Sequence, residues 1–325
     1  MIKKIAVMTT GGDASGMNAA IRAVVRTAVG SGLEVAGILE GLHGLLHNQF
    51  IPMDIASVGG IINRGGTMLH TVRSKDFHKK EVRKIAYDYL ADRRIDGIIS
   101  IGGDGSRQGL YAITRETGIP SCFIPASIDN DVCGTDYTIG FDSAVNVGLD
   151  AIDKIRDTAA SHQRIFIVEV MGREHGFVAL EVGLAGGAEL ILIPEFKADL
   201  SIKKIASVLN NGIRRGKNSS IIVMAEGVGR SSDFAKKIEK ATGMETRYTV
   251  LGYIQRGGAP TAFSRRLGLT FGYEAVKCLM KLKAKQSMMV GMQCNKIVTM
   301  DMKSVIGKER KIDADVYNMN KVFSL

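Results

Sequence analysis

Short runs of apolar residues alternate along this chain with longer segments whose apolar positions recur at helical spacing. Residues 4–9 predict a buried strand. Residues 18–29 then predict a helix, with Ala19, Ala20, Val24 and Val25 among its apolar positions. Apolar strands separated by helices are typical of parallel sheets covered on both faces. We therefore predict an α/β protein with two doubly wound domains and mainly parallel sheets.

The same alternation predicts the other elements. Strands are expected at residues 33–38, 96–101, 122–125, 165–170, 190–193, 220–225 and 245–251. Helices are expected at residues 80–91, 106–115, 144–160, 176–184, 202–214, 233–241 and 262–283. The larger domain is predicted to span residues 1–138 and about 252–302, and the smaller one residues 139–251 and about 303–325. The tail from Lys303 carries no recognisable motif and is predicted only to be structured.

Composition narrows the class of protein. Glycine contributes 38 of 325 residues and proline only 5, with 45% hydrophobic residues. This composition excludes disordered, collagen-like and small disulfide-stapled proteins. Abundant glycine without proline indicates close backbone approaches. The four cysteines (122, 133, 278 and 294) show no CxxC spacing, which predicts free thiols in a reducing compartment.

The net charge of 43 − 33 = +10 favours anionic partners, such as phosphorylated small molecules, nucleic acid or a membrane surface. Long basic runs and tryptophan are both missing from the sequence, which argues against nucleic-acid binding. No apolar stretch approaches 18 residues, and the apolar run at residues 5–8 is too short for a signal peptide. We expect a cytoplasmic protein.

Three loops that follow predicted strands carry candidate chemistry. Residues 9–18 (TTGGDASGMN) join the first strand to the first helix, where glycines let backbone N–H groups approach a phosphate. This loop matches neither the dinucleotide fingerprint nor the P-loop. A plain tight turn is the alternative.

The second loop, residues 101–106 (IGGDGS), places Asp104 among glycines and Ser106 as an expected helix N-cap. A carboxylate beside backbone donors suits a Mg²⁺–nucleotide site, and several kinase families use this pattern. In the third loop, residues 125–131, Asp129 and Asp131 are expected to face one side of an extended segment. One carboxylate could accept a hydroxyl proton while the other helps to hold a metal. A turn rich in Asp and Asn is the alternative.

Arginines are expected beside glycine turns at strand ends, where a guanidinium can bind phosphate bidentately. These are Arg73, Arg164, Arg173, Arg247 and Arg256.

Taken with these motifs, the chain resembles the bacterial ATP-dependent 6-phosphofructokinases over nearly its whole length. The resemblance rests on residues 11–18, 63–67, 102–106, 128–131, 134–141, 161–164, 168–173 and 254–258. It implies transfer of a phosphoryl group from Mg-ATP to the 1-hydroxyl of fructose 6-phosphate in glycolysis, by a cytoplasmic homotetramer with allosteric control.

The resemblance also implies roles for individual residues. Asp129 would be the general base, Ser127 would contact the transferring phosphoryl group, Arg173 would neutralise its charge, and Asp104 would hold Mg²⁺. The nucleotide would be bound by Gly12, Arg73, Ser74, Gly103, Asp104, Gly105 and Ser106. Fructose 6-phosphate would be bound by Ser127, Ile128, Asp129, Arg164, Met171, Gly172, Arg173, Glu226, Arg247, Tyr253 and Arg256. In this family the equivalents of Arg164 and Arg247 reach in from a neighbouring subunit.

Three departures from the family pattern matter. Tyr253 replaces a frequent histidine of the sugar-phosphate site, and Ser127 a usual threonine. Ala126 replaces a common glycine. Pyrophosphate-dependent relatives have lysine at the position of Ala126 and aspartate at that of Gly105, so the small residues here favour ATP as the donor.

Three alternative functions remain open for the chain: a pyrophosphate-dependent enzyme, a lipid or NAD kinase, and a non-catalytic regulatory paralogue.

The family's effector site for ADP or phosphoenolpyruvate is only partly matched. Matching positions are Arg22, Arg26, Arg156, Gly187, Glu189, Arg215 and Lys217. Ile55, Ala56, Gly60 and Ser219 replace an arginine, a tyrosine, an aspartate and a histidine. Loss of a phosphate-binding arginine and a stacking ring predicts reduced or altered allostery.

Overall fold

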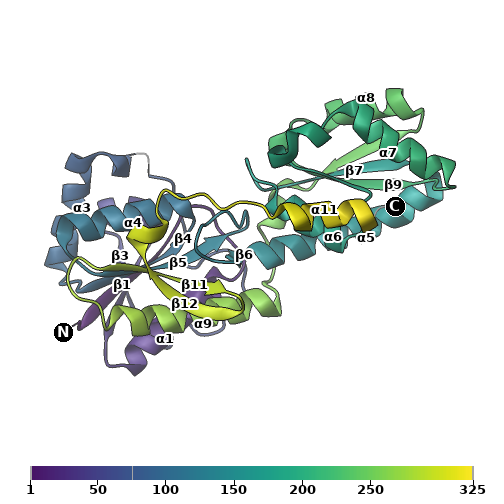
Figure 1. Ribbon diagram of the computed structural model, residues 1–325. Helices are drawn as coiled ribbons and strands as arrows, with labels where there is room; N and C mark the ends of the chain where they lie inside the picture. The colour runs from purple at the N-terminus through teal and green to yellow at the C-terminus, as the bar shows by residue number, and fades with distance from the viewer. Residues whose placement is uncertain (1, 75, 324–325) are drawn as a thin grey trace. The chain divides into compact units, whose positions relative to one another are not determined.

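A computed structural model describes residues 2–74 and 76–323 and contains two compact units (Figure 1). Unit 1 comprises Met1–Ser143 and Arg256–Arg310, and unit 2 comprises Ala144–Gln255 and Lys311–Leu325. The chain passes between them somewhat later than the expected limits at residues 138, 251 and 302. Helix α5 (Phe141–His162) runs from unit 1 into unit 2 without interruption, so hydrophobic pattern marks no boundary there.

Unit 1 is built on one sheet that has eight strands within the described residues, in the order β12-β11-β5-β4-β1-β2-β3, with β6 beside β5. The contacts among β11, β5, β6, β4, β1 and β2 are parallel, while β3 and β12 pair antiparallel at the two edges. The strands are β1 (Lys4–Thr10), β2 (Glu34–Ile38), β3 (Phe50–Met53), β4 (Gly97–Gly102), β5 (Ser121–Ser127), β6 (Ile139–Gly140), β11 (Ser287–Gln293) and β12 (Lys296–Asp301).

Helices cover both faces of this sheet (Figure 1). α1 (Met17–Gly30) and α9 (Ala262–Leu279) lie on one face, and α3 (Lys80–Asp92) and α4 (Asp104–Thr117) on the other. Gly268 and Gly272 of α9 meet the α1 backbone so closely that a Cβ on either would lie within 2.8 Å of it. Short helices complete the unit: α2 (Gly41–Leu46), η1 (Asp76–His78) and α10 (Met302–Val305).

Unit 2 has a parallel sheet of order β10-β7-β9-β8. Its strands are β7 (Ile165–Val170), β8 (Leu190–Leu192), β9 (Ser220–Ala225) and β10 (Thr246–Val250). α7 (Ile202–Arg214) and α8 (Ser231–Thr242) cover one face, while α5 and α6 (Phe177–Ala185) lie on the other, with α11 (Ala314–Phe323) beside α6 (Figure 1). The turns η2 (Pro194–Asp199), η3 (Glu226–Val228) and η4 (Gly252–Gln255) complete the unit.

The predicted α/β class and mainly parallel sheets are confirmed. The elements at residues 165–170, 202–214 and 220–225 have the predicted bounds. Other predicted bounds differ from the structure: α9 ends at Leu279 and not at residue 283, α4 begins at Asp104 and not at Ser106, and α5 begins at Phe141 and not at residue 144. The hydrophobic pattern did not predict α2, β3, β6, β11, β12 or the C-terminal helices.

The topology of unit 1 fixes where ligands can bind. From β1 the chain proceeds to β2 on one side, and it later returns to β4 on the other. Loops after β1 and β4 therefore diverge at the carboxyl edge, which is the usual ligand position in open α/β sheets. None of the described helices combines the length and apolarity needed to cross a membrane.

Candidate active site

The two glycine-rich loops of unit 1 meet at this divergence point. A Cβ on Gly11 would stand 3.1 Å from the Ser106 Oγ, and one on Gly102 would stand 2.3 Å from the Thr10 carbonyl oxygen. The Thr71 hydroxyl donates to the Gly11 carbonyl oxygen at 2.8 Å and holds the first loop. The structure thus brings the predicted residues Gly12 and Ser106 into one region of unit 1.

The loop after β1 also contacts the segment that begins at Arg256. The Arg256 Nη1 lies 2.4 Å from the position of a Cβ on Gly12, and 3.6 Å from the Asp13 carboxylate. The Ser15 hydroxyl donates to the Gly258 carbonyl oxygen at 2.9 Å. Arg256 therefore belongs to the neighbourhood of the glycine-rich loop.

Asn18, the last residue of the first motif, secures the 63–67 segment. Its side-chain amide donates to the carbonyl oxygens of Arg64 and Gly65 at 3.1 Å each, and its Oδ1 accepts the Met68 N–H at 2.7 Å. These hydrogen bonds hold the 63–67 segment against the start of α1.

Asp104 lies at the first position of α4, and about 38% of its side chain is exposed. Its carboxylate pairs with Arg107 and accepts the Gln108 side-chain amide at 2.8 Å. Arg107 is fully buried, and its Nη1 donates to the Cys133 carbonyl oxygen at 3.1 Å. The expected N-cap role of Ser106 is wrong: Gly103 precedes the first helical residue, and Ser106 is buried in the first turn against Gly11.

The glycines flanking Asp104 leave open backbone. Among the described residues, and apart from chain neighbours and its own helix, nothing lies within 4 Å of a Cβ on Gly105, while one on Gly103 would stand 4.0 Å from the Ala126 carbonyl oxygen. Space above bare backbone at the start of a helix suits a phosphate, and Mg²⁺ is commonly held by one or two carboxylates together with substrate phosphates. The donor set around Asp104 therefore fits a Mg²⁺–nucleotide. Within residues 2–74 and 76–323, no group of three or more His, Cys, Asp or Glu has the geometry of a metal site.

The loop after β5 does not have the extended shape assumed for it. Asn130 has a φ of 54°, so the simple alternation of Asp129 and Asp131 does not apply. Asp129 is 3% exposed, and Asp131 is half-buried. The Ser127 hydroxyl donates to Asp131 at 3.1 Å and accepts the Asp129 N–H at 3.1 Å. This hydroxyl orders the loop and connects the two acidic residues.

Arg73 and Ser74 follow Thr71 in an irregular segment of unit 1. Arg73 is exposed and Ser74 is half-buried. No hydrogen bond or ion pair of their side chains is seen among the described residues. The preceding residues hold the segment beside the loop after β1: the Thr71 hydroxyl donates to the Gly11 carbonyl oxygen, and the Thr9 hydroxyl donates to the His70 carbonyl oxygen, at 2.8 Å each.

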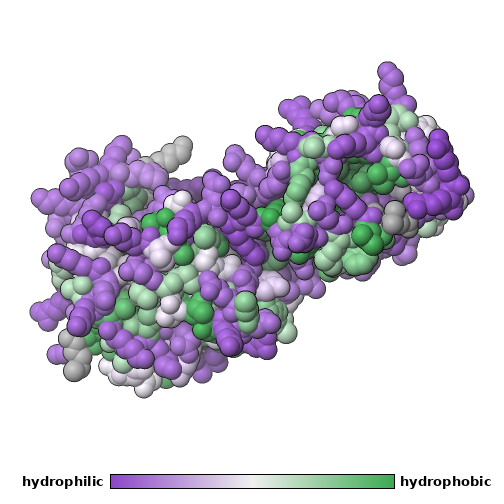
Figure 2. Space-filling view, viewed as in Figure 1, coloured by the Kyte–Doolittle hydropathy of each residue, from purple (hydrophilic) through white to green (hydrophobic). Residues whose placement is uncertain are grey.

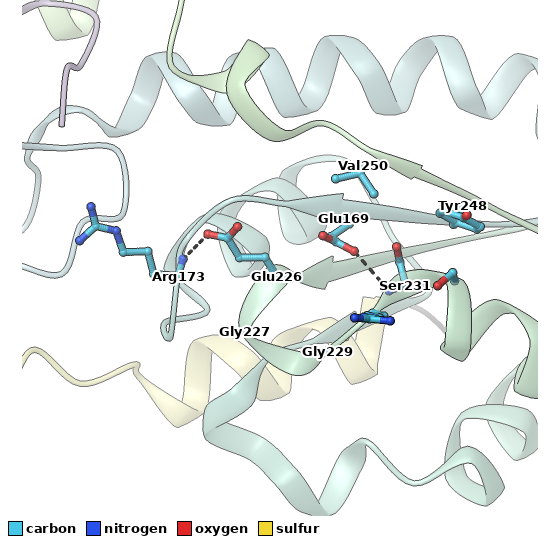
Figure 3. Close-up of a pocket in the computed structure, with 10 residues that line it drawn as sticks. Glu169, Arg173, Glu226, Gly227, Gly229, Ser231, Tyr248 and Val250 are labelled. Atoms are coloured by element: carbon cyan, nitrogen blue, oxygen red, sulfur yellow. Dashed lines mark hydrogen bonds between the residues drawn. The ribbon is translucent and has the colours of Figure 1, made fainter.

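A second cluster occupies the carboxyl end of the unit 2 sheet. One Glu226 carboxylate oxygen accepts the N–H groups of Gly172 at 3.1 Å and Arg173 at 2.6 Å. Gly172 has a φ of 145° and Arg173 a φ of 52°, both in the left-handed half of backbone space that costs free energy for arginine. The Arg173 side chain extends away from Glu226 (Figure 3). Glu226 therefore fixes the backbone and leaves the guanidinium directed outward.

This cluster borders a cavity of about 550 Å³. Glu169, whose carboxylate accepts the Ser231 N–H at 3.3 Å, lines the cavity (Figure 3). The Met171 N–H is bound by the buried Gln255 side chain at 2.8 Å. The structure thus brings the candidate residues Met171, Gly172, Arg173 and Glu226 together at the carboxyl end of the unit 2 sheet.

Arg164 and Arg247 do not join that group. Arg164 precedes β7 and Arg247 is the second residue of β10, so both lie at the amino edge of the unit 2 sheet. The six residues of β7 put about 20 Å between this edge and Arg173. The expectation that all five arginines lie on loops at strand ends is therefore wrong for Arg247, which lies within β10.

Glu245 lies between the two amino-edge arginines. Its carboxylate oxygens pair with Arg164 and with Arg247. Burial works to raise the pKa of Glu245, but the hydrogen bonds and charges of Arg164 and then Arg247 outweigh it, so the net pKa is below the usual value. Sequence reasoning missed Glu245, although its position two residues before Arg247 was a signal.

The residues matched to an effector site fall into two sets. In unit 2, Arg156 donates to the carbonyl oxygen of Gly187 at 3.1 Å, and Lys217 lies 3.4 Å from Glu189. Arg215 lies just after α7 and is exposed. In unit 1, Arg22 and Arg26 lie on α1 and Ile55 is 47% exposed.

Of the remaining candidate residues for the sugar phosphate, Tyr253 is 82% exposed and Ile128 is buried.

Hydrophilic side chains cover most of the visible face of each unit (Figure 2). All four cysteines carry free thiols.

Comparison of the chain with known proteins finds relatives that share one family description. The family model described as Phosphofructokinase matches residues 4–279. The chain is 50% identical over 324 residues to an ATP-dependent 6-phosphofructokinase of Halalkalibacterium halodurans, covering 100% of both chains. It is also 50% identical to one of Clostridium tetani, covering 99% of this chain and 100% of that one.

Solved structures have the same fold. A phosphofructokinase of Saccharomyces cerevisiae is 35% identical with a TM-score of 0.89; the match covers 94% of this chain and 45% of the yeast chain. A pyrophosphate-dependent phosphofructokinase of Marinobacter aquaeolei superimposes with a TM-score of 0.87 at 21% identity, covering 98% and 88% of the two chains. At that identity the second match bears on the fold alone.

Proposed function

The chain belongs to the phosphofructokinase family, and on this premise we propose how its residues perform the reaction. The activity is that of an ATP-dependent 6-phosphofructokinase, a glycolytic kinase that transfers a phosphoryl group from ATP to fructose 6-phosphate. The fold, with two mainly parallel α/β units, agrees with that assignment.

One observation carries the assignment of roles. The 102–106 loop and the 127–131 loop follow β4 and β5, which are adjacent parallel strands. Their ends therefore share one edge of the unit 1 sheet, and a phosphate above Gly103 and Gly105 would lie near Asp129. This arrangement supports a donor phosphate and an acceptor base side by side.

We assign Asp129 as the general base that accepts the proton of the sugar 1-hydroxyl as its oxygen attacks the γ-phosphorus. Ser127 hydrogen-bonds the transferring phosphoryl group, and Asp131 orients Ser127 through its 3.1 Å hydrogen bond. Arg173 offsets negative charge on the phosphoryl oxygens. Such positioning and electrostatic stabilisation supply most of the catalysis in phosphoryl transfer.

The nucleotide is assigned to Gly12, Arg73, Ser74 and the 103–106 loop. Asp104 would hold Mg²⁺, and Mg²⁺ supplies neutralisation of the phosphate charges when it is bound. The residue Gly105 leaves room for the nucleoside portion of ATP because it carries no side chain.

Fructose 6-phosphate is assigned to two sets of residues. Those on the unit 1 loops are Ser127, Ile128, Asp129 and Arg256. Those of unit 2 are Met171, Gly172, Arg173, Glu226 and Tyr253. Arg164 and Arg247, at the opposite edge of the unit 2 sheet, would serve the site of a neighbouring subunit in a homotetramer. Their separation of about 20 Å from Arg173 supports this role.

We propose that ADP or phosphoenolpyruvate regulates the enzyme only weakly. The residues that would bind the effector are Arg22, Arg26, Arg156, Gly187, Glu189, Arg215 and Lys217. The replacements at Ile55, Ala56, Gly60 and Ser219 support the weakening. A cytoplasmic location is supported by the four free thiols.

Initial rates with fructose 6-phosphate and Mg²⁺, with ATP or pyrophosphate in separate reactions, test the donor. We expect turnover with ATP alone. Turnover with pyrophosphate would contradict the donor argument from Ala126 and Gly105 while leaving the sugar site intact. No turnover with either donor would favour the regulatory paralogue.

A further inference from the structure

A C-terminal segment of unit 1 lies against the loop that carries Asp129 and Asp131. Glu309 forms an isolated antiparallel bridge with Val132. The Arg310 Nη1 donates to the Asn130 carbonyl oxygen at 2.8 Å, across a separation of 180 positions in the sequence. The segment carries no motif, and nothing in the assigned chemistry uses it.

The peptide that Arg310 binds lies between the two carboxylates. Asn130 adopts a left-handed backbone conformation, with a φ of 54°. Its side chain donates to the Asp136 carbonyl oxygen at 3.1 Å and accepts the Thr138 N–H at 2.9 Å. The Asn130 carbonyl group belongs to the peptide that joins Asn130 to Asp131. With the Asn130 side chain already held, a hydrogen bond that fixes this carbonyl group fixes how the chain enters Asp131.

Arg310 also brings a positive charge close to the loop. It is half-buried, and burial lowers the pKa of its guanidinium, while the nearby Asp136 and Asp131 act in the opposite direction. An arginine remains protonated despite such a shift. A charged donor to a carbonyl oxygen forms a stronger hydrogen bond than a neutral donor.

A second arginine holds the far end of the same loop. Arg107 donates to the Cys133 carbonyl oxygen at 3.1 Å, but it also pairs with Asp104 and so belongs to the nucleotide loop. Arg310 instead donates to the Asn130 carbonyl oxygen within the acidic loop, so a change at Arg310 acts on that loop and leaves the Arg107–Asp104 pair in place.

We propose that Arg310 is a positioning residue for phosphoryl transfer, which holds the Asp129–Asp131 loop in its reactive geometry through the Asn130 carbonyl group. The inference rests on the proposed role of Asp129. A general base must lie within hydrogen-bond reach of the proton that it accepts, and a displacement of about 1 Å can cost on the order of 100-fold in rate.

The test compares full-length wild type with Arg310→Met and Arg310→Lys. Methionine has similar length but neither the charge nor the donors. Lysine keeps the charge and one donor but lacks the planar fork. We expect kcat of Arg310→Met to fall about 10- to 100-fold, with KM for ATP and for fructose 6-phosphate within about threefold of wild type. Arg310→Lys should recover part of the loss. Arg115→Met, on an exposed position of α4, is the matched control and should retain wild-type kcat.

Thermal melting separates positioning from stability. Unchanged kcat in Arg310→Met, with or without a lower Tm, would overturn the inference, and so would a rise in KM alone. If Arg310→Met does not fold, wild-type kcat in Arg310→Lys would overturn it. Lack of turnover by wild-type enzyme would instead reject the proposed function together with the inference, which keeps the two failures distinct.

Discussion

Arg256 lies over Gly12 so closely that its Nη1 is 2.4 Å from the position a Cβ on Gly12 would take. Gly12 is not among the glycines with positive φ, so its backbone would accept other residues. The missing side chain, and not backbone freedom, is what the position requires. A residue assigned to the nucleotide and one assigned to the sugar phosphate are thus fitted together within unit 1.

Gly12→Ala should therefore displace the Arg256 guanidinium. We expect kcat/KM to fall about 10- to 100-fold for both substrates, since small displacements of positioning groups are costly. Gly257→Ala is the matched control because no heavy atom lies within 4 Å of a Cβ there. Equal kinetics in the two variants would show that Arg256 moves aside without consequence.

Asp129→Asn keeps the shape of the side chain and removes the base. General base catalysis contributes about 10²- to 10⁴-fold, so kcat should fall by that factor while KM for both substrates stays within a few-fold. A coupled assay for ADP release measures this. Asp131→Asn, which weakens the hydrogen bond to Ser127 but keeps the Asp129 carboxyl group, should lose less. The assignment of the base would be wrong if the two variants lost activity in the reverse order.

Sequence pattern predicted the buried parallel strands best. β9 is buried at all six positions, and α7 begins after Ser201, whose side chain caps it by accepting the Lys204 N–H. Such elements carry their own signals of apolar run and cap. The edge strands β3 and β12 carry no such signals. In β12 exposed and half-buried positions are mixed, and its pairing with β11 depends on tertiary contacts.

At the candidate site, the sequence pattern predicted residues but not their geometry. Asp104 and Asp129 were singled out because acidic residues in loops after parallel strands lie where ligands bind in open α/β sheets. The left-handed Asn130 is stabilised by Thr138 and Asp136, so its conformation is not visible in local spacing. The hydrogen bonds of Arg107 to Cys133 and of Arg310 to Asn130 also join residues that are distant in the sequence, so local spacing does not reveal them.

If Asp104 holds the cation as proposed, Arg107 would compete with that cation for the Asp104 carboxylate. Arg107→Met removes the ion pair, so Asp104 should hold a divalent cation more tightly. Because the Asp104 end of the pair is partly exposed and solvent screens it, we expect only about a two- to fivefold decrease in the Mg²⁺ concentration for half-maximal activity. Mn²⁺ binding in the presence of nucleotide, followed by electron paramagnetic resonance, gives a readout independent of turnover.

Gln108→Met is the control for that experiment, because Gln108 donates to the other Asp104 oxygen without a charge. Its effect should be smaller than that of Arg107→Met. Weaker cation binding in Arg107→Met would instead mean that Arg107 orients Asp104 for the metal.

Effector control should be weak and partly restorable. Ile55 is 47% exposed and stands where the family has a phosphate-binding arginine. We expect ADP and phosphoenolpyruvate to shift the fructose 6-phosphate saturation curve of the wild type only slightly, and Ile55→Arg to enlarge the ADP response. Titration of activity with each effector measures this. Strong cooperative shifts in the wild type would contradict it.

Glu245 makes a prediction about pH and stability. Its pairing with Arg164 and Arg247 holds the folded-state pKa below the usual value, although burial opposes this. A depressed carboxylate pKa contributes stability that is fully present above the unfolded-state pKa, about 4.3 for Glu, and is lost as pH falls through the folded-state pKa. Glu245→Gln should therefore lower Tm at pH 7, and the Tm difference from wild type should disappear as pH falls below about 4.

Glu34→Gln is the control, because it removes an exposed carboxylate that lies 3.6 Å from the Lys4 ammonium group. It should lower Tm at pH 7 by less than Glu245→Gln does. A gap for Glu245→Gln that stays constant into acid would mean that packing, and not the ionised carboxylate, accounts for its contribution.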